Sequence, residues 1–256
     1  MSISFEMAGA VRGGLVAVRA SLTVDWYFRM SGQLERWDWG EHRAPVIHRL
    51  QSVRRPRSSA RNRHIPVSAY TITNGAHVDL ESGLEHDLLR RVDRDPRITW
   101  IVAQPLRLVW TGSESGSHTP DLLTCDVEDV VTVWDAKLED EHDRHFREAV
   151  AVTRAACSAV GWRHEVFTGL GAVERLNLLW LHGFRRSPEW LPTYEERICA
   201  SVENGAVPLG TLLALDDGSG EAVSAVWHLV WTGVLDMDLA RPITPVSPVS
   251  LVRSSA

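Results

Sequence analysis

Apolar positions in the middle of the chain follow two spacings, one typical of strands and one typical of helices. Residues 119–125 and 130–137 are rich in β-branched and aromatic side chains, which favours strands. Polar residues 126–129 between them predict a turn, and residues 162–167 predict another strand. Helical spacing of apolar residues predicts helices over residues 84–92, 139–160 and 172–184. This order predicts an α/β fold in which a mixed sheet is flanked by helices.

The region after Pro188 and Pro192 has a different pattern, and the two prolines mark a boundary. Gly233 ends the last helical segment, and residues 234–239 predict a strand. Helices are expected over residues 193–202, 208–215 and 221–231. Three helices followed by a β-ribbon predict a C-terminal winged helix, a fold that often reads DNA with its third helix.

Composition agrees with a soluble enzyme. The chain has 256 residues and 44% hydrophobic residues, enough for one domain and a smaller second one. Its three cysteines are far apart, which fits a reducing cytoplasm and predicts neither disulfides nor a zinc framework. No stretch approaches the length of a membrane span, so we expect a cytoplasmic protein without membrane contact.

Lys137 is the only lysine among 27 basic residues. Its ammonium is a compact point charge, whereas guanidinium is a wide, planar fork, and a narrow site beside a metal and a phosphate suits the ammonium. Alternation along a strand puts Asp135 and Lys137 on one face. The alternative is a coding bias that disfavours lysine and left one by chance.

Asp121 stands at the start of the neighbouring predicted strand. If residues 119–125 and 130–137 pair as a hairpin, Asp121 approaches Asp135. Two carboxylates at strand ends hold a hard divalent cation such as Mg²⁺, and Lys137 would orient a nucleophilic water or stabilise developing charge. The competing interpretation is an edge hairpin with solvated Asp and Lys side chains.

A further acid, Glu85, lies beside the apolar stripe of the helix predicted over residues 84–92. Ser82 three residues earlier makes a capping-box pattern, in which Glu85 would bond the Ser82 backbone amide. From spacing alone, the cap is favoured slightly over a catalytic role.

Pro-Asp, 13 intervening residues and Asp-x-Lys together resemble the PD-(D/E)XK nuclease motif. The order of longer segments is similar to the TnsA-like endonuclease subunit of heteromeric transposases, over roughly residues 60–187. The segments are Glu-Ser-Gly-Leu-Glu-His-Asp-Leu-Leu (81–89), Ala-Gln-Pro-Leu-Arg-Leu-Val-Trp (103–110), Ser-His-Thr-Pro-Asp-Leu-Leu (117–123), Asp-Ala-Lys (135–137), Val-Gly-Trp-Arg-His-Glu-Val-Phe (160–167) and Asn-Leu-Leu-Trp-Leu-His-Gly-Phe-Arg-Arg (177–186).

The resemblance implies a restriction-endonuclease-like fold and a catalytic set of Glu85, Asp121, Asp135 and Lys137. The three acids would hold Mg²⁺, with Mn²⁺ as a substitute. The family's subunit cuts the 5′ ends of the transposon, beside a DDE-type transposase subunit that cuts the 3′ ends and an AAA+ ATPase regulator. The expected partners are therefore double-stranded DNA at transposon ends and these two proteins. The family's Gln-Pro element also brings Gln104 near the site, although an ordinary strand-entry role is favoured over this.

Charge differs along the chain. Residues 188–256 carry nine acids and three arginines, and the resulting charge of −6 equals the net charge of the whole protein. Its predicted third helix has no Lys or Arg, so we expect this domain to bind protein rather than DNA. A loop-like arm with no acid is the candidate for phosphate contact, the alternative being a solvated linker. Its arginines are Arg54, Arg55, Arg57, Arg61 and Arg63.

We therefore expect three parts: an N-terminal extension with the basic arm (1–64), a PD-(D/E)XK nuclease domain (65–187) and a winged-helix domain that binds a partner (188–256). Residues 1–50 receive no function from their sequence. Two alternatives to the transposase nuclease remain open. One is a catalytically silent adaptor between DNA and a partner protein, and the other is a stand-alone restriction or repair nuclease.

Overall fold

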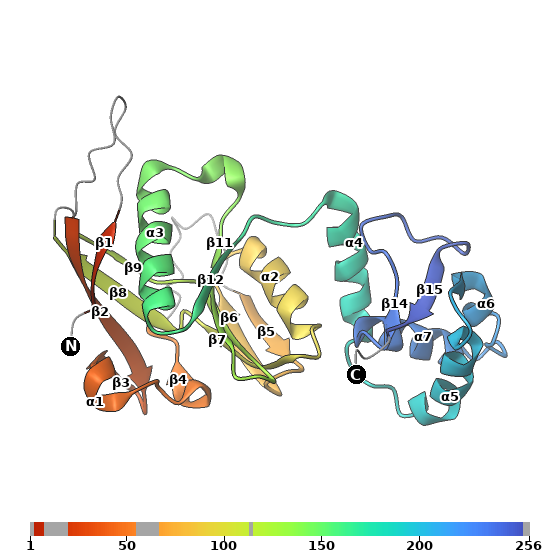
Figure 1. Cartoon of the computed structure of the whole chain (residues 1–256). Helices are drawn as coiled ribbons and strands as arrows, with labels where there is room; N and C mark the ends of the chain where they lie inside the picture. The colour runs from red at the N-terminus through yellow and green to blue at the C-terminus, as the bar shows by residue number, and fades with distance from the viewer. Residues whose placement is uncertain (1–2, 8–19, 55–66, 113–114, 253–256) are drawn as a thin grey trace. The chain divides into compact units, whose positions relative to one another are not determined.

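The computed structural model describes residues 3–7, 20–54, 67–112 and 115–252 and is a mixed α/β structure (Figure 1). The chain forms two compact units. The first is drawn from residues 1–86 and 98–169, and the second from residues 87–97 and 170–256. Across the described ranges, none of the helices has both the length and the apolar character that crossing a bilayer requires.

Three sheets, one of them the two-stranded β5-β6 pair, and one long helix form the first unit. Its helices are α1 (Trp39–His42), η1 (Ile47–Arg49), the start of α2 (Gly83–Asp93), η2 (Glu139–Glu141) and α3 (Arg144–Ala159). Its strands are β1 (Ile3–Met7), β2 (Ala20–Met30), β3 (Gln33–Trp37), β4 (Leu50–Gln51), β5 (Val67–Thr71), β6 (Ala76–Leu80), β7 (Ile98–Ala103), β8 (Leu106–Thr111), β9 (Gly116–His118), β10 (Leu122–Asp126), β11 (Val131–Ala136) and β12 (Arg163–Phe167).

The first sheet has the order β1-β2-β8-β9, and β3 and β4 also pair with β2. Strict alternation along β2 buries Trp26 and Phe28, whereas Tyr27 between them is partly exposed. These aromatic side chains join one core with apolar residues of β8, β10, β11 and α3. Residues expected as a separate N-terminal extension are therefore part of the first unit, because β2 pairs with β8 along six residues.

The second sheet has the order β12-β11-β10-β7. β7, β10 and β11 are antiparallel neighbours, and β12 returns parallel to β11 after α3. Helix α2 precedes these strands. When β8 and β9 of the first sheet are left out, α2, the strands of this sheet and α3 follow one another along the chain as α-β-β-β-α-β. Leu122 pairs with Trp134 in the β10–β11 ladder, which confirms the expected hairpin and places Asp121 beside the end of β11.

The second unit is mainly helical. It contains the end of α2, then α4 (Ala172–Leu181), η3 (His182–Phe184), α5 (Leu191–Val202), β13 (Val207–Pro208), α6 (Leu209–Leu213), α7 (Glu221–Trp231), β14 (Leu235–Asp236) and β15 (Pro248–Leu251). The three short strands pair in the order β13-β15-β14. Eight residues of α7 are buried, and six of them pack with α4, α5 and α6 in a second core.

Two expectations differ from this structure. The helix predicted from residue 139 begins at Arg144, because the Asp143 side chain accepts a hydrogen bond from the Phe146 amide and caps it there. The expected boundary at residue 188 also differs, since α4 belongs to the second unit. Leu178 and Leu181 of α4 are buried in the second core.

Candidate functional site

Asp121 lies at the point where β10 meets the ends of β7 and β11. Its backbone N–H donates to the Trp134 carbonyl, and its carbonyl accepts from the Gln104 N–H, both at 2.9 Å. Its side chain turns toward β11, where Oδ2 accepts the Ala136 N–H at 2.7 Å. The side chain is thus fixed by the sheet itself, and within the described ranges Oδ1 takes no hydrogen bond.

Electrostatics shows which acids surround Asp121. Burial is the main cause that raises its pKa well above the ordinary value, and the nearby carboxylates of Glu85 and Asp135 raise it further. The hydrogen bond from Ala136 acts in the opposite direction without compensating. The structure therefore brings the three predicted acids into one electrostatic cluster at the ends of the strands.

Glu85 is buried in the first turn of α2. Its Oε2 accepts the Glu81 N–H at 2.8 Å, and Ser82 Oγ accepts the Glu85 N–H at 3.1 Å. The capping interpretation is therefore confirmed in kind, although the carboxylate bonds the amide of Glu81 rather than that of Ser82. Burial raises the pKa of Glu85, and these hydrogen bonds partly oppose the shift. One carboxylate thus caps the helix and faces Asp121.

Gln104 connects these parts and is almost fully buried. Its backbone φ of 40° is left-handed, a conformation that non-glycine residues avoid and that is found at strained functional positions. Its Nε2 donates to Glu85 Oε2 at 3.4 Å, and its Oε1 accepts from Ser52 Oγ at 3.3 Å. Gln104 therefore contacts Glu85 and ties it to the end of β7, which goes beyond the strand-entry role that its sequence position favoured.

Asp135 is the most enclosed of the acids, with 1% of its surface exposed. His118 Nε2 lies 2.7 Å from Oδ1, and His164 Nε2 lies 2.9 Å from Oδ2. Burial acts to raise the pKa of Asp135, but the hydrogen bonds and charges of both histidines outweigh it and lower the pKa to about 2. We call this arrangement the histidine clamp.

Neither histidine was among the residues predicted from the sequence. His118 belongs to the Ser-His-Thr-Pro-Asp segment, three residues before Asp121. His164 is on the buried face of β12, where alternation would have placed it. Its Nδ1 is buried without a hydrogen-bond partner among the described residues. A polar residue on an apolar strand face was the available signal.

Lys137 follows β11, and its side chain extends toward the start of α3. Its Nζ lies 4.7 Å from the centre of the Phe146 ring, a cation–π contact. The pKa of Asp143 is lowered, first by the hydrogen bond from the Phe146 amide and then by the positive charge of Lys137, whereas burial acts in the opposite direction. Within the described part of the chain, no ion pair joins Lys137 to Asp121 or Asp135.

The donor set suits a hard cation only in part. Carboxylate oxygens are the ligands that Mg²⁺ prefers, and Asp121 has an uncommitted one. Both oxygens of Asp135, however, accept hydrogen bonds in the histidine clamp. Over the described ranges, no group of three or more His, Cys, Asp or Glu side chains is arranged to hold a metal. The three acids therefore do not form an assembled metal site among the described residues, and Asp135 could bind a cation only after release by a histidine.

The basic arm is described only at its first residue. Arg54 forms an ion pair with Glu81, whose side chain is 28% exposed. Arg55, Arg57, Arg61 and Arg63 lie outside the described residues. Of the five arginines predicted to contact DNA, Arg54 is therefore the one whose surroundings are described.

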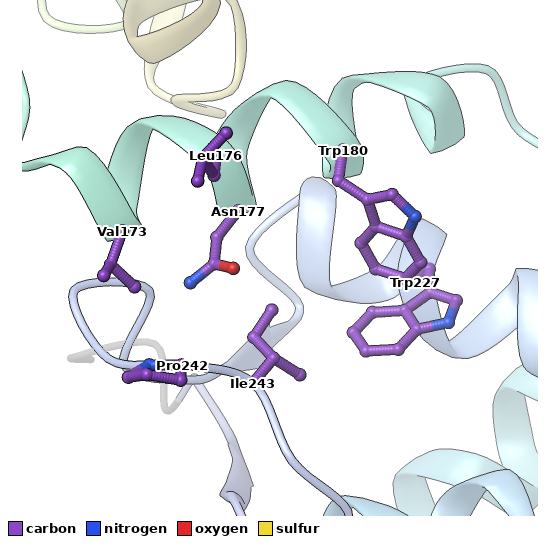
Figure 2. A pocket seen from close by; sticks show the side chains of 7 residues that line it. All are labelled: Val173, Leu176, Asn177, Trp180, Trp227, Pro242 and Ile243. Carbon is purple, nitrogen blue, oxygen red and sulfur yellow. The ribbon is translucent and has the colours of Figure 1, made fainter.

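A cavity in the second unit has a different chemistry (Figure 2). Its volume is about 480 Å³, and its walls come from α4, α7 and the segment that follows β14. Trp180 is 47% exposed and stands edge-on to Trp227, with ring centres 4.4 Å apart. Asn177 donates to the carbonyls of Leu239 and Arg241, which fixes the segment. The lining is Val173, Leu176, Asn177, Trp180, Trp227, Pro242 and Ile243.

Comparison with known proteins adds no assignment: no family model matches the chain, and no curated protein matches it.

Proposed function

We propose that this protein is a metal-dependent DNA endonuclease whose first unit is a restriction-endonuclease-like domain of the PD-(D/E)XK type. The observation that carries the proposal is Asp121, held between two further acids at the ends of adjacent strands. Clusters of like charge with raised pKa values are typical of catalytic or metal-binding sites. The α-β-β-β-α-β order supports the same class of fold.

In this proposal Glu85, Asp121 and Asp135 hold Mg²⁺, or Mn²⁺ in its place. A bound cation would supply charge stabilisation at the scissile phosphate and a more acidic water. The chain itself fixes the Asp121 carboxylate through the Ala136 amide and positions Glu85 through Gln104. Lys137 would swing from the Phe146 ring toward the acids to orient the attacking water.

We further propose that the nuclease cuts the 5′ ends of a transposon within a heteromeric transposase. This step rests on the TnsA-like order of segments from residue 81 to residue 186. The second unit, with winged-helix-like element order, would contact the DDE-type transposase or the AAA+ regulator. Its α7 contains no Lys or Arg and is largely buried, which favours protein over DNA as the partner. Such an enzyme would work on the nucleoid in the cytoplasm.

One observation favours a second candidate, a catalytically silent nuclease-fold adaptor. The histidine clamp occupies both oxygens of Asp135, and the Lys137 ammonium lies over Phe146. In an adaptor these contacts would be permanent, and the acids would never assemble around a cation.

Cleavage and metal binding separate the two candidates. We would incubate the full chain with plasmid carrying transposon ends, with its transposase partners and with Mg²⁺ or Mn²⁺, and map the products. Nicks with 5′-phosphate and 3′-hydroxyl ends that vanish in Asp121→Ala support the nuclease. Absence of cleavage, together with no Mn²⁺ binding by calorimetry, would establish the adaptor. A genome that encodes a DDE-type transposase and an AAA+ ATPase beside this chain would support the partner assignment.

A further inference from the structure

An open cavity of about 520 Å³ lies in the first unit, apart from the acids themselves. Its walls come from β3, the segment after β4, β8 and the β9 strand with the residue after it. Two arginines, a histidine and two hydroxyls give it a polar, cationic lining. The residues are Leu34, Val53, Arg54, Arg107, Ser117, His118 and Thr119.

Arg107 is the available cation of this cavity. β8 buries Leu106 and Leu108 on its core face, so alternation exposes Arg107 on the opposite face. Among the residues that the structure describes, no carboxylate pairs with Arg107. An exposed guanidinium at the wall of a cavity, without an acid to neutralise it, is suited to bind an anion in a bidentate manner.

The cavity adjoins the acid cluster at two points. His118 lines the cavity and holds Asp135 Oδ1 at 2.7 Å. Arg54 also lines the cavity. Burial raises the pKa of Glu85, and the positive charge of Arg54 acts in the opposite direction. Thr119 lies two residues before Asp121 in the chain. An anion bound at Arg107 would therefore lie beside the acids, where the next unit of a polyanion could reach them.

We propose that this cavity binds a backbone phosphate of the DNA strand next to the scissile one. Arg107 would supply the guanidinium, and the Ser117 and Thr119 hydroxyls would donate to the remaining phosphate oxygens. Arg54 would exchange the Glu81 carboxylate for the same phosphate. The identity of the anion as DNA rests on the proposed nuclease function, whereas the position of the phosphate site rests on the cavity.

Binding without metal tests this site separately from cleavage. We would measure the anisotropy of a labelled DNA duplex with the full chain in EDTA over a series of KCl concentrations. Arg107→Ala should weaken binding and reduce the log–log salt slope by about 0.9, the value for one lost phosphate contact. Ser117→Glu places an acid in the cavity and should weaken binding as well. Glu81→Gln releases Arg54 and should strengthen it.

Arg163→Ala is the matched control. Arg163 is exposed and lies in the same unit, but it pairs with Thr132 at the far end of β11 from Asp135. It removes one positive charge without touching the cavity, so its salt slope should equal that of the unmodified protein. All variants change exposed or partly exposed side chains, and thermal melting would verify that they fold.

The outcomes are distinct. Arg107→Ala and Ser117→Glu with unchanged slope and affinity would overturn the phosphate site. Equal losses in Arg107→Ala and Arg163→Ala would overturn it too, because binding would then follow net charge. A selective loss at Arg107, in a protein that never cleaves DNA, would support the phosphate site while the nuclease proposal fails. If the protein cleaves DNA but the salt slopes of the cavity variants are unaltered, the nuclease proposal stands and the phosphate site is overturned.

Discussion

Asp87 of the second unit and Asp121 of the first are carboxylates with opposite electrostatic surroundings. In the second unit, Asp87 is paired on both oxygens, with Arg90 Nη1 at 2.7 Å and Arg175 Nε at 2.5 Å. In the first unit, burial raises the pKa of Asp121 well above the ordinary value, and the charges of Glu85 and Asp135 raise it further. One carboxylate is neutralised by the fold, and the other is left in an unfavourable state.

This difference separates structure from function. A buried carboxylate that lacks a cation lowers stability, and such a carboxylate among other acids is typical of a functional site. Removing Asp87 should therefore damage the fold, whereas removing Asp121 should damage only the chemistry.

Asp121→Asn should abolish metal-dependent cleavage. The substitution keeps the size of the side chain and removes the charge that would bind the cation. Loss of several kcal/mol of transition-state stabilisation corresponds to a rate reduction of roughly a thousandfold or more. Single-turnover cleavage of an end-labelled duplex measures it. Asp79→Asn, on the exposed face of β6, is the control and should cleave normally. Equal rates for the Asp121 variant and the control would remove Asp121 from the site.

Asp87→Ala should destabilise the second unit by about 3–5 kcal/mol, since it leaves two guanidinium groups without their buried partner. Arg90 is itself buried, which lowers its pKa despite the opposing charge of Asp87. Urea unfolding measures the loss. Asp238→Ala is a matched control with the same spacing, because Arg241 and Asp238 form an exposed pair worth less than about 1 kcal/mol. Similar losses in both variants would contradict the contrast between the units.

Lys137→Arg should reduce cleavage by on the order of a hundredfold while leaving stability unchanged. The larger, planar head group misplaces the donor, and about 1 Å of misplacement costs that much. Arginine can retain the contact with the Phe146 ring, so the variant should have the same melting temperature as the unmodified protein. Near-normal turnover would show that the single lysine reflects composition rather than chemistry.

Sequence patterns predicted the local part of this structure well. The strand alternation around Asp121 and Asp135 predicted their hairpin, and the ladder from Leu122 to Trp134 confirms it. The helix over residues 221–231 is also confirmed, because a stripe of apolar residues specifies a buried helix face without knowledge of its partner.

Long-range contacts were not accessible in the same way. The histidine clamp joins residues 17 and 29 positions apart, and only the three-dimensional sheet brings β9 and β12 to the two sides of Asp135. Likewise, the pairing of β2 with β8 depends on a register that no local pattern encodes. The expected domain boundaries differ from the two compact units for this reason.

The smallest effect concerns stability and pH. Because the folded-state pKa of Asp121 is raised, the folded protein keeps a proton that the unfolded chain has already lost, so stability falls as pH rises through that interval. Asp121→Asn removes this penalty and should stabilise the protein at neutral pH by about 0.5–2 kcal/mol, the usual gain at a strained functional position.

Asp135 has the opposite sign, which makes it an internal reference for the same measurement. With its folded pKa at about 2, its stabilising contribution is present above the unfolded value of about 4 and is lost as pH falls toward 2. Urea unfolding from neutral to acid pH should therefore show a gain in stability for the unmodified protein before the acid loss begins. Asp121→Asn should show a smaller gain, since the raised pKa of Glu85 remains, and should keep the loss. A variant less stable than the unmodified protein at neutral pH would mean that Asp121 is held as a structural carboxylate, like Asp87.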